Sequence, residues 1–136
     1  MSVVKELLRG EESGAISFGD YTLEQKGKLE DYEFHGDVYK VKTCHEITRL
    51  EKNGLFVYES VPGSAVNDFV EKENGVNFKV EGSESVQITL GLAEATEYVI
   101  YVDEQQVGLM ETNRSGKLSI SVETAGKEVQ VKIVQR

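Results

Sequence analysis

Val86-Gln-Ile-Thr-Leu90 is the first of several short segments in which apolar and polar residues alternate. The pattern returns in Tyr98-Val-Ile-Tyr-Val102, in Leu118-Ser-Ile-Ser-Val122 and in Val129-Gln-Val-Lys-Ile133. Successive side chains of an extended chain point to opposite faces, so a period of two buries one face of a strand and exposes the other. The segments therefore predict antiparallel strands with one face in a core and the other in water.

Length and composition indicate one soluble globular domain, or two very small ones packed together. The chain has 136 residues, of which 39% are hydrophobic and 29% are charged. Its net charge is -9, with 8 basic and 12 acidic side chains in residues 1–62 and 7 and 12 in residues 63–136. Because no basic patch interrupts this even acidity, we expect neither nucleic acid nor a membrane as a partner.

Cys44 is the single cysteine, which excludes an internal disulfide framework. The first nine residues lack the long apolar core and the cleavage site of a signal peptide. No segment approaches the ~20 apolar residues that a transmembrane helix requires. These features lead us to expect a cytoplasmic protein.

The first 62 residues predict about six strands joined by short turns. Residues 3–8 fit either a helix capped by Ser2 and ended by Gly10 or a strand, and the β-rich sequence that follows favours the strand. Further strands are expected over residues 15–19, 21–28, 29–34, 38–43, 47–50 and 55–58. Asn53-Gly54 separates the last two, and both residues tolerate the positive φ of a tight hairpin turn.

Pro62 is the only proline in the chain and follows the last of these strands. Proline cannot donate to a strand ladder and keeps the preceding residue extended, so it predicts a break between two regions. We expect an N-terminal β-sheet region, residues 1–62, packed on a C-terminal immunoglobulin-like sandwich, residues 63–136. About seven strands are expected after Pro62. The predicted fold class is all-β, an antiparallel β-sandwich.

Leu92-Ala-Glu-Ala-Thr-Glu-Tyr98 resembles the Leu-x-Pro-x-Thr-x-Tyr corner of fibronectin type III domains. Leu92, Thr96 and Tyr98 match, whereas Glu94 replaces the proline. In that family the tyrosine hydroxyl bonds back to the preceding corner, so the resemblance implies a buried Tyr98 bonded to backbone at this corner. The resemblance extends from Ser64 to the end of the chain and implies an immunoglobulin-like sandwich. The buried tryptophan of such domains is missing, because the chain has no tryptophan.

Four other segments carry a second resemblance: Ile16-Ser-Phe-Gly19, Tyr39-Lys-Val-Lys-Thr43, residues 53–63 and Ser115-Gly-Lys-Leu-Ser119. Together they are similar to a small bacterial family whose members sometimes carry the label endosialidase. Sialidase catalysis uses an arginine cluster, a tyrosine nucleophile and a propeller scaffold. This chain has four arginines and is too short for a propeller. The resemblance therefore implies a family and not an activity.

Cys44-His45-Glu46 is the one cluster of reactive side chains. Adjacent residues on a strand point to opposite faces, so Cys44 and His45 cannot form a nucleophile–base pair unless a bulge intervenes. On a continuous strand, Cys44 would share the face of Lys40 and Lys42. We therefore expect an exposed, dispensable thiol and a structural role for His45.

Metal and cofactor signatures are weak throughout the chain. His35 precedes Gly36 in an expected turn, and two histidines with one cysteine do not match the spacing of a zinc site. Calcium requires several oxygen ligands from one loop, a pattern that the acidic pairs do not follow; these pairs are Glu11-Glu12, Asn67-Asp68 and Asp103-Glu104. We expect no catalytic, cofactor-binding or metal site, no cofactor and no enzymatic activity.

Aromatic residues such as Phe56 and Tyr58 occur on strands that are apolar on both faces. Such strands lie in the interior of a sandwich or present an apolar face to a partner. The leading hypothesis is a non-enzymatic structural or protein-interaction module; the alternative is a carbohydrate-binding accessory module, and a glycosidase ranks third.

We also expect self-association as a homodimer through residues 129–134, because the last strand of an open sheet leaves unpaired edge groups.

Overall fold

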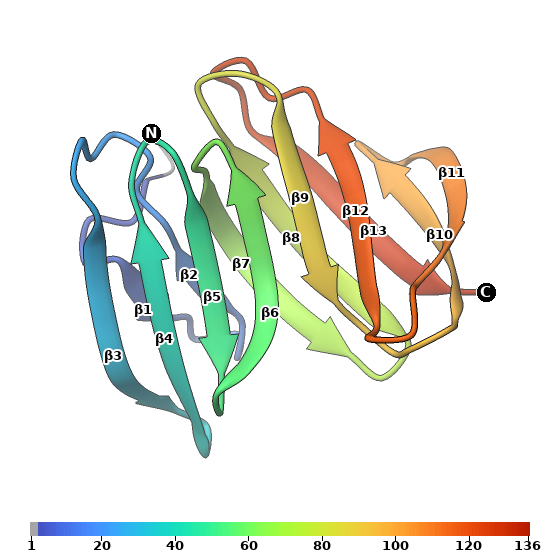
Figure 1. The fold of residues 1–136 in the computed structure, drawn as a ribbon, viewed down its shortest axis with the longest axis horizontal. Helices are drawn as coiled ribbons and strands as arrows, with labels where there is room; N and C mark the ends of the chain where they lie inside the picture. Colours follow the sequence, from blue (N-terminus) through green and yellow to red (C-terminus); the bar gives the residue numbers. More distant parts are fainter. Residues whose placement is uncertain (1–2) are drawn as a thin grey trace.

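The computed structural model describes residues 3–136, which form thirteen strands and no helix. The strands are β1 (Leu8–Gly10), β2 (Ile16–Phe18), β3 (Gly27–Phe34), β4 (Asp37–Thr43), β5 (Thr48–Lys52), β6 (Leu55–Val61), β7 (Ala65–Lys72), β8 (Gly75–Glu81), β9 (Val86–Gly91), β10 (Glu97–Val102), β11 (Gln105–Glu111), β12 (Lys117–Val122) and β13 (Val129–Gln135). They build two antiparallel sheets that lie face to face (Figure 1). One sheet has the strand order β1-β2-β7-β8-β13-β10-β11, and the other has the order β12-β9-β6-β5-β4-β3. The predicted all-β sandwich is confirmed.

Each sheet contains strands from both sides of Pro62. β2 pairs with β7 in the seven-stranded sheet, and β6 pairs with β9 in the six-stranded sheet. One hydrophobic core includes Leu50 and Tyr58 from the first half of the chain and Phe78 and Ile133 from the second. The expected regions 1–62 and 63–136 are therefore not separate sheets. Pro62, which follows a cis peptide bond, marks the passage of the chain from one sheet to the other.

Two tight turns fall where the sequence predicts them. Asn53 and Gly54, with φ of 52° and 78°, join β5 to β6. His35 and Gly36, with φ of 50° and 83°, join β3 to β4 in the same way. Two-residue turns with positive φ match the twist of the flanking strands, which explains why they set the hairpin register here.

The N-terminal segment departs from the prediction. Only the end of residues 3–8 joins a strand, since Leu7 has a positive φ of 74° and β1 begins at Leu8. Ser2, the expected cap of the alternative helix, lies outside the described residues. The strand expected over residues 21–28 starts only at Gly27, because Asp20 folds the chain into a turn by accepting a hydrogen bond from the Thr22 backbone N–H at 3.0 Å.

The C-terminal strand is also placed differently. β13 lies inside the seven-stranded sheet, paired with β8 on one side and β10 on the other. The chain crosses from β9 in the six-stranded sheet to β10 without pairing β10 to β8, and β13 fills the gap that remains. The expectation that residues 129–134 form a free edge is wrong, so the predicted homodimer loses the edge on which it depended.

Tyr98 lies at the start of β10, at the corner between the two sheets. Its side chain is 3% exposed, and its hydroxyl accepts a hydrogen bond from the Ala93 backbone N–H at 3.1 Å. Thr112 binds the same corner, because its hydroxyl donates to the Ala93 carbonyl at 2.6 Å and accepts from the Thr96 N–H at 2.9 Å. The predicted burial and backbone hydrogen bond of Tyr98 are confirmed.

Tyr98→Phe should lower the free energy of unfolding by about 1 kcal/mol, the usual net value of one hydrogen bond, because Ala93 loses its acceptor. Urea denaturation measures the change. Tyr101→Phe is the matched control, since the Tyr101 hydroxyl makes no hydrogen bond among the described residues. Equal stability of the two variants would contradict a stabilising role for the corner hydrogen bond.

Candidate binding sites

The cluster Cys44-His45-Glu46 lies in a bend that follows β4. Cys44 is 4% exposed, and its backbone N–H donates to the Ile47 carbonyl at 2.8 Å. His45 and Glu46 are exposed, so the structure does not bring the thiol and the imidazole together. The expected exposed thiol beside lysines is wrong, because β4 ends at Thr43 and strand alternation does not continue into the bend.

Tyr21 and Glu81 form a hydroxyl–carboxylate pair. The Tyr21 hydroxyl donates to Glu81 Oε2 at 2.6 Å, and Glu81 is 8% exposed. Burial is the main cause that raises the pKa of Tyr21 to about 12. The hydrogen bond to Glu81 and the negative charge of Glu81 act in the same direction. A nucleophile requires the opposite shift. The pair therefore acts as a structural contact between the chain after β2 and the end of β8.

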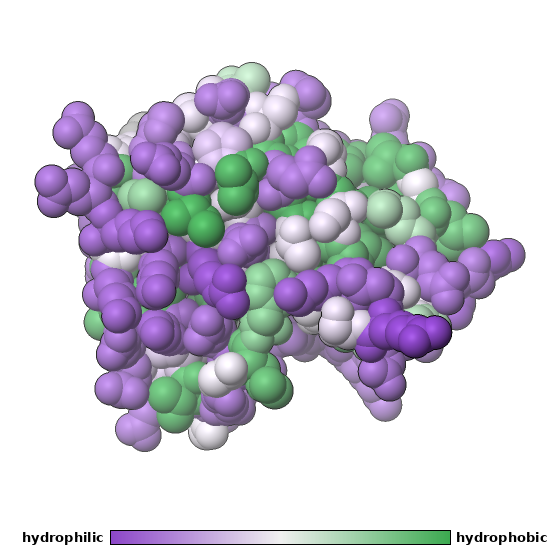
Figure 2. Space-filling model, in the orientation of Figure 1, coloured by the Kyte–Doolittle hydropathy of each residue, from purple (hydrophilic) through white to green (hydrophobic). Residues whose placement is uncertain are grey.

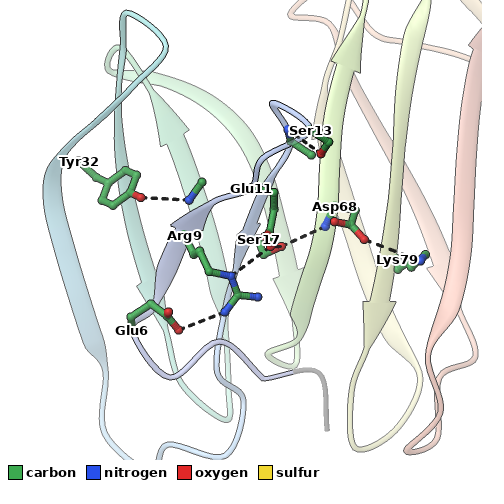
Figure 3. Close-up of polar contacts among 10 residues, drawn as sticks. Glu6, Arg9, Glu11, Ser13, Ser17, Tyr32, Asp68 and Lys79 are labelled. Carbon is green, nitrogen blue, oxygen red and sulfur yellow. Dashed lines mark hydrogen bonds and ion pairs between the residues drawn. The ribbon is translucent and has the colours of Figure 1, made fainter.

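Two of the acidic residues noted in the sequence, Glu11 and Asp68, are engaged with neighbouring groups (Figure 3). Glu11 accepts hydrogen bonds from the Ser17 hydroxyl and, at 3.1 Å, from Arg9 Nε; the Ser17 hydrogen bond is the main reason that the pKa of Glu11 is lowered. Asp68 lies 3.7 Å from Lys79 Nζ, and its backbone N–H donates to Ser17 Oγ at 3.1 Å. Within residues 3–136, no group of three or more His, Cys, Asp or Glu side chains is placed to hold a metal ion.

Two neighbouring pockets lie at one end of the sandwich, beside the β5–β6 and β3–β4 hairpin turns. These compartments have volumes of about 460 Å³ and 180 Å³, and both are lined by Lys52 and Glu71. The Lys52 ammonium donates to Glu71 Oε1 at 2.7 Å, which joins β5 to β7 where the compartments meet. We name these two compartments together the end cleft. Figure 2 shows the larger one as a hollow between the β5–β6 hairpin and the lower ends of β9 and β12.

The larger compartment has an aromatic wall. The Arg49 guanidinium lies 5.2 Å and the Lys117 ammonium 4.8 Å from the centroid of the Phe56 ring. Gly91 permits this arrangement, because a Cβ there would lie 2.5 Å from the Phe56 carbonyl oxygen. Arg49 is also paired with Glu59 at 3.0 Å. The compartment therefore combines an apolar ring with positive charge.

The smaller compartment is lined by titratable side chains. It includes His35, Asp37 and Tyr39 in addition to the ion pair of Lys52 and Glu71. Tyr39 is 8% exposed, and its hydroxyl has no hydrogen-bond partner among the described residues. Burial is the main reason that the pKa of Tyr39 is raised. Of these residues, only His35 was considered as a possible ligand from the sequence, because the others come from three strands, β4, β5 and β7, and share no motif.

A third feature lies on the side where β11 and β12 form the edges of the two sheets, which we name the open side (Figure 1). β11 carries three exposed apolar side chains, with Val107 60%, Leu109 46% and Met110 39% exposed. Val107 and Met110 line a groove of about 360 Å³ together with Ile100 and Ile120, whereas Leu109, the neighbour of Met110, lies on the other face of the strand. Figure 2 shows hydrophobic residues gathered on this side of the molecule.

Comparison of the chain with protein-family models, curated proteins and solved structures found no match. The fibronectin-like and endosialidase-family resemblances therefore stay predictions. No helix long and apolar enough to cross a membrane occurs in the part of the chain that the structure describes.

Cys44→Ser should lower the free energy of unfolding by about 1–2 kcal/mol, because the more polar hydroxyl is then buried in place of the thiol. The exposed neighbour provides the control: His45→Ser should change stability by less than about 0.5 kcal/mol. Urea denaturation of both variants tests the assignment. A Cys44→Ser protein as stable as the parent would contradict a buried thiol.

Alkaline titration tests the Tyr21–Glu81 pair. The raised pKa means that the folded state favours the protonated phenol, so the associated stability is present below pH ~10, the ordinary tyrosine value, and is lost as the pH rises towards about 12. Tyrosinate absorbance is measured for the parent protein and for Tyr21→Phe. The difference between the two curves should titrate near pH 12. A difference centred near pH ~10 would show an unperturbed phenol.

Proposed function

We propose that this protein is a non-enzymatic interaction module that binds a partner protein through its open side. The observation that carries the proposal is the exposure of Val107, Leu109 and Met110 on one edge strand. Exposed apolar groups cost free energy in water, and clustered ones are typical of protein-binding surfaces. A partner that covers these side chains removes them from water.

The other edges of the sandwich support the assignment by contrast. β3, the far edge of the six-stranded sheet, carries Lys28, Glu30 and Glu33, and β1, the far edge of the seven-stranded sheet, has only three residues. Charged side chains and short strands are the usual protection of an edge against unwanted pairing. β11 has seven residues, of which only Glu111 is charged. The open side therefore lacks the protection found on the opposite side.

Charge indicates the chemistry of the partner. β11 is preceded by Asp103 and Glu104 in its hairpin turn and ends at Glu111, on a chain of net charge -9. A partner with apolar side chains flanked by lysine or arginine complements both parts of this surface. A second copy would bring the same acidic groups together. The bulge between Ile100 and Tyr101 in the β10–β11 pairing also disturbs a regular ladder at this edge.

A photo-crosslinking amino acid at position 107 of the full chain, expressed in the cells that naturally produce it, tests the proposal. The expected product is a covalent complex with a different polypeptide, and mass spectrometry should map the link to a segment with apolar and basic residues. The matched control carries the crosslinker at Val61, which is 52% exposed but lies on β6, away from the open side. The Val61 variant should not capture the same segment.

Two further variants make the result specific. Met110→Glu should abolish the crosslink from position 107, because Met110 lines the same groove as Val107 and the change adds negative charge to it. Raised salt should weaken the crosslink by screening the basic groups of the partner. The proposal fails if positions 107 and 61 capture the same products. It also fails if the sole product from position 107 is a dimer of this chain.

A further inference from the structure

We infer that the end cleft is a binding site for a neutral, hydroxyl-rich ligand of the saccharide class, held across the Lys52–Glu71 ion pair. This inference does not rest on the interaction at the open side. It follows from the polar groups that the cleft leaves available, from the charges around them and from the aromatic ring beside them.

The Tyr39 hydroxyl is the first of these groups. Tyr39 is 8% exposed and lines the smaller compartment, and its hydroxyl has no hydrogen-bond partner among the described residues. Every other buried hydroxyl in residues 3–136 is bonded, and no fully enclosed side-chain nitrogen or oxygen is left without a partner. Because polar groups of buried side chains are normally bonded, the open hydroxyl of Tyr39 marks a position where a ligand atom completes the site.

The neighbouring groups provide both donors and acceptors. The Lys52 ammonium has three donors and uses one on Glu71. Asp37 Oδ1 accepts from Asn53 Nδ2 at 2.9 Å, which leaves its other oxygen available. A ligand hydroxyl donates and accepts at once, so it can bond to the carboxylates and to the ammonium. Hydrogen bonds to such charged groups are the stronger kind.

The charges around the end cleft are mixed in sign, because Asp37, Glu71 and Lys52 line the smaller compartment and Lys117 lines the larger one. Asp37 and Glu71 oppose an anion, while Lys52 lies beside them and opposes a cation. An apolar ligand would leave all three charged groups desolvated without partners. A neutral ligand with several hydroxyls is the class that avoids each of these costs.

The larger compartment extends the site. Its volume of about 460 Å³ lies within the range of known ligand pockets, roughly 300–1,000 Å³. Leu55, Phe56 and Leu92 line it with apolar groups against which the C–H face of a sugar ring can pack, and Ser115 and Lys117 line the same space. A chain of two or three sugar units would occupy both compartments, with Lys52 and Glu71 beneath the link between them.

A glycan array probed with the full chain tests the inference, followed by calorimetric titration of the neutral oligosaccharide with the highest signal. Tyr39→Phe should weaken binding about 2- to 10-fold, the range for one neutral hydrogen bond. Its fold should persist, because the lost hydroxyl has no partner in the described chain. Glu71→Gln should weaken binding by about 10-fold or more, since a charge-assisted hydrogen bond is lost.

Tyr101→Phe is the matched control, because Tyr101 lies outside the end cleft and its hydroxyl makes no hydrogen bond among residues 3–136. This variant should bind the oligosaccharide as tightly as the parent. Three results would overturn the inference: no saccharide on the array is bound, only amine-bearing saccharides are bound, or the affinity is unaffected by both Tyr39→Phe and Glu71→Gln.

Discussion

The Ser64 side chain and backbone hold the two sheets together where the chain passes between them. Ser64 Oγ lies 2.8 Å from the Tyr58 hydroxyl and 2.6 Å from Ser60 Oγ. The Ser64 N–H donates to Thr48 Oγ1 at 3.0 Å, and the Thr48 hydroxyl donates to the Ser64 carbonyl at 2.9 Å. All four residues are fully buried. A satisfied polar network in a core specifies one arrangement, because any shift would leave a desolvated hydroxyl without a partner.

Backbone segments approach closely around this network. A Cβ at Gly19 would lie 2.3 Å from the Ser64 carbonyl oxygen, and one at Gly63 would lie 1.9 Å from the Cys44 carbonyl oxygen. The end of β2, the bend after β4 and the passage from β6 to β7 are thus packed main chain against main chain. This packing buries Cys44 and explains why Pro62 joins two sheets of one structure instead of separating two domains.

The features that the sequence predicted correctly depend on nearby residues. Asn53-Gly54 sets a hairpin by its own φ preferences, and the Tyr98 corner is formed within a segment of seven residues. The position of β13 could not be predicted in this way, because alternation indicates which residues are extended but not which strands become neighbours. The same limit applies to the end cleft, since Lys52 and Glu71 come from different sheets. The Cys44 prediction failed because strand alternation was extended beyond Thr43, where β4 ends, into the bend that contains Cys44.

The two proposed sites lie where the fold leaves an interaction incomplete. Elsewhere in the described chain, the buried polar atoms of the sandwich are hydrogen-bonded. The edges are protected by the charged side chains of β3 and by the short length of β1. At the open side, the edge strand exposes apolar side chains without such protection. At the end cleft, the Tyr39 hydroxyl has no hydrogen-bond partner among residues 3–136. Because a sequence that specifies one structure is consistent at most positions, local departures of this kind are where function is expected.

The departures also differ in chemistry. An apolar surface requires a partner that excludes water, whereas an open hydroxyl among charged groups requires a ligand whose own hydrogen bonds replace those of water. One small sandwich can therefore present two surfaces that do not compete for the same ligand.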